Sequence, residues 1–288
     1  MEQLDLFFPS ASVTNTQLEQ IGMVSIPRSD GKWLNLKSNE LTRREQLLLE
    51  QLLSSEKEGA SSNPWYAYLV RNQGPLPSQV RLVQFLHVQI IRHTDQNDFE
   101  AEWLDVLTHL LPNLVTSLKI TPDRYVFILN QDPHFSVESI MAEILASMEF
   151  DFGMTITAFL GQMWPEKMMS NWAEAYQLEA HLFSHNLHKA SFSGFNQFSI
   201  TLLRTAGETS ADLYSLLAQL IMGQDDMEET IKALWEEQAV VTKAAQKLYI
   251  HRNTLQYRLD KFQEQTGLSL KNMDDLAVCY VALLQFSS

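Results

Sequence analysis

Apolar and polar residues follow one pattern between residues 80 and 198 and a different pattern after Leu202. In the middle part, two kinds of segment alternate. Some are short runs of apolar and β-branched residues, as long as a strand, and in the others apolar residues recur at helical spacing, as Trp103, Leu107 and Leu110 do. We expect strands at 80–91, 114–120, 125–129 and 154–160, and helices at 99–111, 137–148 and 165–183. The order β-α-β-β-α-β predicts an α+β fold, a ferredoxin-like sheet with helices on one face.

The first 62 residues do not share this alternation. A short apolar start at residues 4–8 leads through turn-rich sequence to a helix predicted from about Leu41-Thr42, with Leu47, Leu48 and Leu52 on one stripe. The polar stretch 54–63 predicts a linker, and a short helix at 65–70 should stop at the Gly and Pro residues of 74–77. We therefore predict an accessory segment at 1–62, an α+β domain at 63–202 and an all-α domain at 203–288.

The last part of the chain is predicted to be wholly helical. Ser210 is expected to cap a helix that runs to Met222, and a second helix covers 227–237. Residues 241–266 then fit a helix, a tight turn and another helix. Small side chains at Ala244 and Ala245 allow the second helix to approach closely.

The boundaries of this helix-turn-helix follow from capping residues. Thr242 is a good N-cap for the first helix because its hydroxyl can accept a bond from a free backbone N–H. Residues 249–251 form a three-residue connection. The second helix is expected to start at Arg252 or Asn253 and to end before Gly267, which suits the left-handed position after a helix.

Helical geometry gives the second helix two faces. Leu255, Leu259 and Phe262 share one face and should pack on the domain core. The opposite face is polar and carries Asn253, Gln256, Tyr257 and Lys261, with Thr254 at its margin. Asn and Gln can bind adenine with two hydrogen bonds in the major groove, and Thr can contact a thymine methyl group. The pattern therefore predicts a DNA-reading helix, whose amino-terminal residues face the bases.

Charge restricts DNA binding to this one window. The chain has a formal net charge of −14, so at long range it repels a phosphate backbone. Between Thr242 and Phe262, however, Asp260 is the one acidic residue against five basic ones: Lys243, Lys247, Arg252, Arg258 and Lys261. Six acidic residues lie just upstream: Asp225, Asp226, Glu228, Glu229, Glu236 and Glu237.

Composition limits the cellular setting. No run of eighteen apolar residues occurs, the start of the chain is acidic where a signal peptide would be basic, and Cys279 is the one cysteine. One cysteine cannot form an internal disulfide and is normal in a reducing cytosol. We expect a cytoplasmic protein that binds no membrane.

The residues from Ala244 to Leu259, which include His-Arg-Asn-Thr-Leu at 251–255 and Tyr-Arg-Leu at 257–259, resemble the C-terminal helix-turn-helix of PucR/CdaR-type regulators. The similarity continues through Thr266-Gly267-Leu268 to Leu284. The central part is similar to the degenerate GGDEF-like module of that family, notably over 170–176, where the sequence is Ser-Asn-Trp-Ala-Glu-Ala-Tyr. The resemblance implies a bacterial transcription regulator, often an activator, that acts as a homodimer or higher homo-oligomer.

The predicted DNA contacts combine the helical faces, the charges and the resemblance. They are Thr242, Lys243, His251, Arg252, Asn253, Thr254, Gln256, Tyr257, Arg258 and Lys261. Gln256 stands where many relatives have a basic residue, which puts the operator preference in doubt. We expect double-stranded DNA as partner, a small-molecule effector as a further one, and control of a metabolic or transport operon.

Three other groups of residues in the chain have alternative interpretations. A nucleotide cyclase needs paired carboxylates and a Gly-Gly turn, but the hairpin at 119–125 has one carboxylate and no glycine. His181, His185 and His188 at helical spacing suit a helix end better than a zinc site. The aromatic residues at 65, 66, 68, 164, 172 and 176 are interpreted as core. We expect no catalytic residue, cofactor or metal. A nucleotide- or metabolite-processing enzyme, or a metabolite-binding module, is kept as the alternative.

Overall fold

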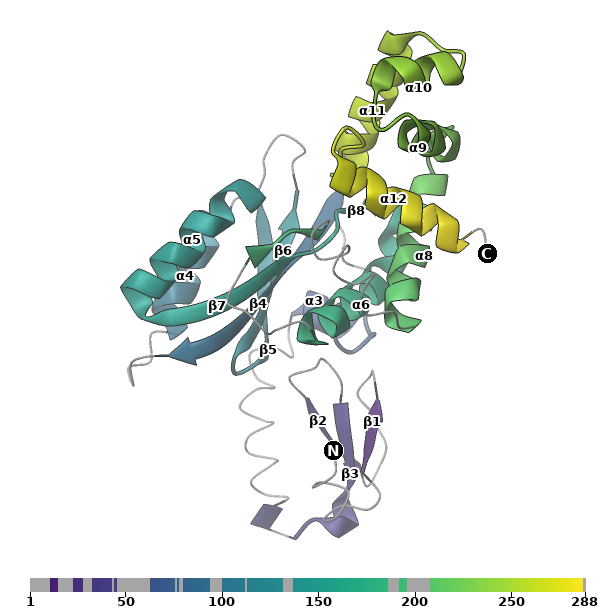
Figure 1. Cartoon of the computed structure of the whole chain (residues 1–288). Coiled ribbons are helices and arrows are strands. Elements are labelled where there is room, and N and C mark those ends of the chain that lie inside the picture. Colours follow the sequence, from purple (N-terminus) through teal and green to yellow (C-terminus); the bar gives the residue numbers. More distant parts are fainter. Residues whose placement is uncertain are drawn as a thin grey trace.

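The computed structural model describes residues 11–14, 23–27, 33–42, 44–45, 63–75, 77, 80–93, 100–111, 113–131, 137–185, 192–195 and 208–286. A small amino-terminal sheet, a central sheet with helices and a group of carboxyl-terminal helices follow one another along the chain (Figure 1). In the described part, no helix has both the length and the apolarity that crossing a membrane requires.

The amino-terminal sheet was not predicted. Its three antiparallel strands have the order β1-β3-β2 and are β1 (Ser12–Thr14), β2 (Met23–Pro27) and β3 (Trp33–Lys37). Buried Asn35 links them, since its Oδ1 accepts from Ser25 Oγ at 2.6 Å and its Nδ2 donates to Thr14 Oγ1 at 2.8 Å.

The helix expected from Leu41-Thr42 does begin there. Thr42 and Glu45 form a reciprocal capping box, in which the Thr42 N–H donates to Glu45 Oε2 at 2.7 Å and the Glu45 N–H donates to Thr42 Oγ1 at 3.3 Å. The apolar residues 4–8, the stripe at 47–52 and most of the predicted linker lie outside the described residues.

The central sheet has the predicted ferredoxin-like topology. Its main strands are antiparallel in the order β5-β6-β4-β7, and two helices complete the β-α-β-β-α-β order. The elements are β4 (Leu82–His93), α4 (Glu100–Leu110), β5 (Leu114–Thr121), β6 (Arg124–Asn130), α5 (Val137–Phe152) and β7 (Met154–Leu160). A short strand β9 (Phe192–Ser193) pairs parallel to β7.

Helices cover both faces of this sheet. The two helices of the β-α-β-β-α-β unit, α4 and α5, share one face, as expected, and helices outside this unit cover the other face. Side chains of β4 alternate: Leu86 and Val88 belong to the apolar cluster that includes α4 and α5. Val83 and Phe85 belong to the cluster on the other face, with helices α3 (Pro64–Leu69) and α6 (Trp172–His185). Both sides of β4 are therefore buried, so that even its polar residues Gln84, His87 and Gln89 lie inside the fold.

The single helix predicted at 165–183 is wrong in its first part. Trp164–Pro165 forms a short strand, β8, that pairs with the start of β4, and the Glu166 N–H donates to the Arg81 carbonyl at 2.8 Å. A 3₁₀ helix, η2 (Glu166–Asn171), follows before α6 begins. Pro165, which suits a helix start, here occupies the end of a strand.

A buried polar pair lies between β4 and α6. His87 Nε2 is 3.4 Å from Glu179 Oε2, and both side chains are fully buried. Burial, with a smaller contribution from Arg124, lowers the pKa of His87 to about 3. Burial raises the pKa of Glu179 to about 8, against hydrogen bonds from Trp164 and Gln162 that lower it. Near pH 7 both groups are therefore uncharged, and the contact is a neutral hydrogen bond rather than an ion pair.

The carboxyl-terminal part is helical throughout residues 208–286, as predicted. Its helices are α8 (Glu208–Met222), α9 (Met227–Glu236), α10 (Val241–Lys247), α11 (Arg252–Thr266) and α12 (Met273–Phe286). Ser210 lies inside α8 rather than at its cap. One apolar cluster runs from α3 and α6 through α8 into α11 and α12. Cys279 lies inside it, and burial raises the pKa of its thiol.

Candidate nucleic-acid interface

Helix α10 begins two residues earlier than a cap at Thr242 implies. Val240 occupies the cap position, and its carbonyl accepts from the N–H groups of Lys243 and Ala244 at 3.0 Å. Thr242 is therefore not the N-cap but an exposed residue of the first turn, beside exposed Lys243. Both residues remain on the surface, where a phosphate can reach them.

The connection between α10 and α11 has four residues, 248–251, because α10 ends at Lys247. Tyr249 in this turn adopts a left-handed φ of +54°, which is uncommon for a residue with a side chain. Its side chain is 96% exposed, the largest value among the exposed apolar residues of the described chain. Tyr249 was not predicted as a site residue. The signal in the sequence that indicates an exposed site residue here is an aromatic residue within a tight turn.

His251 caps the reading helix α11. Its Nδ1 accepts from the Asn253 N–H at 3.2 Å, so in this tautomer the ring hydrogen is on Nε2. The exposed imidazole can thus donate outwards from Nε2 while its other nitrogen holds the helix start.

The other end of α11 was predicted correctly. Gly267 has φ +76°, and its N–H donates to the Gln263 carbonyl at 2.8 Å. A Cβ atom at this position would lie 2.7 Å from Met163 Sδ, so the glycine also permits close packing against the segment after β7.

The two faces of α11 are as predicted. Leu255, Leu259 and Phe262 are buried. On the opposite side Tyr257 is 68% exposed, and Asn253 lies on the surface close to it. We call the exposed residues of this side the reading surface; they are Arg252, Asn253, Thr254, Tyr257 and Lys261.

Gln256 is less available than its neighbours. It is half-buried at the flank of α11, and its Nε2 donates to both carboxylate oxygens of Asp260 at 2.9 and 3.1 Å. Lys271 also binds Asp260, and that bond is the main cause that lowers the pKa of the carboxyl group. Gln256 must leave Asp260 before it can bind a base.

Two of the five basic residues between Thr242 and Phe262 form ion pairs with acidic residues. Lys247 pairs with Glu236 and lies 3.6 Å from Glu237. Arg258 Nη2 lies 2.9 Å from Asp226 Oδ2, so Asp226 is not merely a solvated residue before α9. The remaining three, Lys243, Arg252 and Lys261, make no ion pair with any described residue.

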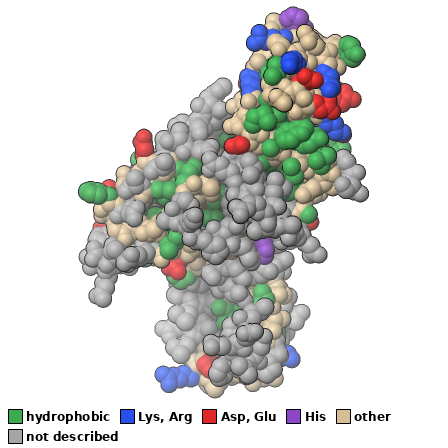
Figure 2. Space-filling view, viewed as in Figure 1, with side chains coloured by type: hydrophobic (Ala, Val, Ile, Leu, Met, Phe, Trp, Pro, Cys, Tyr) green, Lys and Arg blue, Asp and Glu red, His purple; other side chains and the backbone are tan. Residues whose placement is uncertain are grey.

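Basic side chains of the helix-turn-helix lie together at one end of the molecule. Figure 2 shows Lys, Arg and His side chains gathered at the tip formed by the carboxyl-terminal helices, with acidic side chains beside them. Along α11, Thr254, Tyr257 and Lys261 also line a hollow of about 420 Å³ against the loop 223–227. The tip is therefore a local cationic, partly concave surface on an acidic protein.

Other candidate chemistry gains no support from the described residues. Within them, no three or more His, Cys, Asp or Glu side chains form a group that could hold a metal ion. His188 of the predicted trio lies outside them. The aromatic residues of α3, β8 and α6 are core, as interpreted: Trp65, Tyr66, Tyr68, Trp164, Trp172 and Tyr176 are all buried.

Comparisons with known proteins identify the helix-turn-helix. The model of the PucR C-terminal helix-turn-helix domain matches residues 227–284. The chain is 30% identical over 287 residues to a "Leucine-rich protein" of Streptococcus dysgalactiae subsp. equisimilis, covering 99% of this chain and 100% of that protein. It is 52% identical over 52 residues to the carbohydrate diacid regulator of Escherichia coli (strain K12), which is 18% of this chain and 14% of that protein. A regulator of polyketide synthase expression from Bifidobacterium adolescentis matches with a TM-score of 0.40 and 11% identity, covering 85% of this chain and 87% of that one.

Proposed function

The chain belongs to the family of DNA-binding transcription regulators with a PucR-type C-terminal helix-turn-helix, and from this premise we propose that it reads its operator with the amino-terminal half of α11. One observation supports this assignment most: Asn253 and Tyr257 are exposed on the side of α11 opposite to its buried leucines. Nothing described in the chain covers this side.

The side chains of the interface divide by chemistry. The Asn253 amide suits two hydrogen bonds to adenine, and Thr254 suits a thymine methyl group. Lys243, Arg252 and Lys261, which have no acidic partner among the described residues, bind phosphates, and His251 donates from Nε2 to the DNA backbone. Thr242 and Tyr249 lie beside them. Arg258 joins the contacts where DNA phosphate replaces Asp226 as its partner.

The acidic residues of α11 limit how the helix docks. Asp260 and Glu264 are exposed in the second half of the helix, where their charge repels phosphate. The helix therefore enters the major groove by its first two turns, as a helix-turn-helix does.

One such helix gives a small footprint, so two copies of the chain are expected to bind two half-sites about 34–36 Å apart. We propose a homodimer that acts in the cytoplasm, as an activator of a metabolic or transport operon, and responds to a small-molecule effector.

Replacement of Asn253 by Ala tests the reading surface. The full chain first selects its binding sequence from random double-stranded DNA, and the dissociation constant is then measured by mobility shift at fixed salt. We expect Asn253→Ala to lose about 1–3 kcal/mol of binding free energy and to relax the preference at one base position. Folding should not suffer, because Ala is the stronger helix former.

Gln263→Ala is the matched control, since Gln263 is exposed on α11 but lies away from the reading surface. It should bind the selected DNA like the unchanged chain. Equal binding by Asn253→Ala and the unchanged chain, with the same base preference, would show that another surface reads the DNA.

A further inference from the structure

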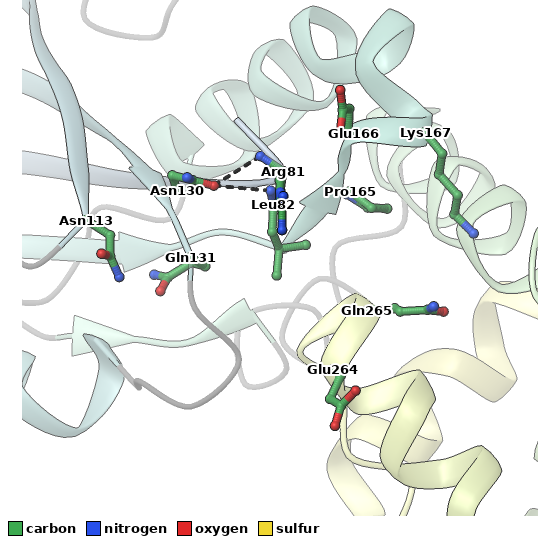
Figure 3. A pocket seen from close by; sticks show the side chains of 10 residues that line it. All are labelled: Arg81, Leu82, Asn113, Asn130, Gln131, Pro165, Glu166, Lys167, Glu264 and Gln265. Atoms are coloured by element: carbon green, nitrogen blue, oxygen red, sulfur yellow. Dashed lines mark hydrogen bonds between the residues drawn. The ribbon is translucent and has the colours of Figure 1, made fainter. Parts of the chain in front are cut away.

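A polar cleft lies between the central sheet and the carboxyl-terminal end of the reading helix. It has a volume of about 690 Å³, within the range of small-molecule sites. One wall comes from the ends of β4, β6 and β8 and from η2, and the other wall is the last turn of α11 (Figure 3). Its lining residues are Arg81, Leu82, Asn113, Asn130, Gln131, Pro165, Glu166, Lys167, Glu264 and Gln265.

The two walls carry opposite charges. Arg81 lies on the sheet side, and Glu264 projects from α11 on the other side (Figure 3). On η2, Glu166 and Lys167 are adjacent and offset one another. A ligand with a single charge is attracted to one wall and repelled by the other, whereas a zwitterion of suitable length places each of its charged groups beside an opposite one.

The uncharged part of the lining consists mostly of amides. Asn130 is engaged, since its Oδ1 accepts from the backbone N–H groups of Arg81 and Leu82 at 3.1 and 3.4 Å. Gln131 is 94% buried, yet its Oε1 accepts no hydrogen bond from any described residue, and the Oε1 of Gln265 is likewise buried without a donor among them. A buried acceptor without a donor is unfavourable, so a ligand N–H group in the cleft favours turning either amide towards it.

Among the described residues that line the cleft, Leu82 and Pro165 are the apolar ones. The cleft thus offers charges and amides at its walls but no pocket shaped for a particular side chain. A short peptide has the matching chemistry in its main chain: a terminal carboxylate, a terminal ammonium group and amide N–H groups between them.

The wall on α11 is joined to the central sheet by hydrogen bonds. From the cleft, Gln131 Nε2 donates to Gln84 Oε1 at 2.7 Å, and Gln84 Nε2 donates to the Gly161 carbonyl at 2.6 Å. The next residue, Gln162, is buried and donates from Nε2 to the Thr266 carbonyl, at the end of α11, at 2.5 Å.

Gln265 brings the cleft close to the DNA-facing side. It lines this cleft and also the hollow beside Tyr257 and Lys261. Occupation of the cleft therefore acts on the same helical turn that Gln162 holds, and that turn belongs to the helix that we assign to the bases.

We propose that this cleft binds a zwitterionic small molecule of the short-peptide class, with its carboxylate toward Arg81 and its ammonium group toward Glu264. Binding there changes how α11 is held against the central sheet. The binding site stands independently of the DNA assignment, whereas its effect on DNA rests on the proposed function.

The experiment uses the full chain and trialanine, because recognition of the main chain does not depend on particular side chains. Calorimetric titration is expected to show saturable binding of trialanine and none of N-acetyl-trialanine amide, which lacks both charges. Arg81→Gln and Glu264→Gln should each weaken trialanine binding at least tenfold. The controls Lys119→Gln and Glu102→Gln, at exposed charged positions outside the cleft, should bind like the unchanged chain.

Three results would overturn the site: no saturable binding of trialanine up to 20 mM (roughly the weak limit of a specific site), equal binding of the blocked peptide, or equal binding by both cleft variants. Saturating trialanine is further expected to shift the dissociation constant for the selected DNA at least threefold. An unchanged constant would refute the effect on α11. None of these results bears on Asn253→Ala, so failure of the cleft and failure of the reading surface are distinguishable.

Discussion

Replacement of Glu179 by Gln should change the pH dependence of folding in a defined window. In the folded chain Glu179 has a pKa of about 8, against an ordinary value of 4.5 for the unfolded chain. A carboxyl group whose pKa is raised on folding stabilises the fold fully below its unfolded pKa. This contribution is lost as the pH rises towards the folded pKa.

His87 has the opposite effect at lower pH. Its pKa is about 3 when folded and 6.5 when unfolded, so the unfolded chain binds the extra proton and stability rises with pH between these values. Between pH 4.5 and 6.5 the two effects oppose one another. From pH 6.5 to 8, Glu179 acts without this compensation, at about 1.4 kcal/mol per pH unit, a loss of about 2 kcal/mol.

The variant keeps the hydrogen bonds of the neutral acid. In Glu179→Gln, the amide oxygen can accept from the Gln162 N–H and from Trp164 Nε1, each 3.0 Å from Glu179 Oε1, and the amide nitrogen can donate to His87. The free energy of unfolding in urea, followed by tryptophan fluorescence at several pH values from 5.5 to 8 (roughly the window set by the two shifts), compares the two chains.

Since all other titrating groups are common to both chains, the difference between them isolates position 179. We expect the variant to gain about 2 kcal/mol on the unchanged chain between pH 6.5 and 8. Parallel curves over this window would mean that Glu179 is already ionised at pH 6.5, and the argument from burial would be wrong.

Three further predictions concern the helix-turn-helix. Tyr249→Gly should leave the free energy of unfolding unchanged within about 1 kcal/mol, because relief of the left-handed strain offsets the chain entropy of glycine. It should weaken DNA binding in a mobility shift several-fold, and a large loss of stability would contradict this reasoning. Gly267→Ala should lower the unfolding free energy in urea by about 2 kcal/mol, because its Cβ meets Met163 at positive φ; an unchanged midpoint would contradict the packing. The logarithm of the DNA association constant should fall linearly with log[salt], with a slope of about −3 per protomer. Lys243→Gln should reduce the magnitude of this slope by about one. An unaltered slope would show that Lys243 does not contact a phosphate.

The central strands could be predicted from sequence because their apolar runs are long and end at clear turns. The amino-terminal sheet could not, since its strands are short and Asn35, a polar residue, lies at its buried centre. The helices on the other face of the sheet, α3 and α6, lie outside the β-α-β-β-α-β unit, so the order of elements does not place them. The helix predicted at 165–183 begins too early, because at Pro165 pairing with β4 wins over helix formation. Such pairing depends on a strand about eighty residues earlier and leaves no local signal.

For the site, the period of α11 was enough to separate buried from exposed residues. It could not show that Arg258 meets Asp226 or that Gln256 meets Asp260, since the charge count treated each residue as independent. The left-handed turn at Tyr249 was hidden because that residue type rarely adopts it. The cleft was beyond prediction, because Arg81 and Glu264 come together only after the whole chain has folded.

The unbroken apolar cluster from Tyr176 on α6 through Leu217 on α8 to Leu276 on α12 has a consequence for protein engineering. A fragment that starts at Glu208 would expose to water the side of α8 that normally packs on α6. Such a fragment would tend to aggregate, because it exposes a large apolar surface. A hybrid regulator that fuses these helices to a different sensor domain would therefore have to include α6 or another apolar surface that covers α8.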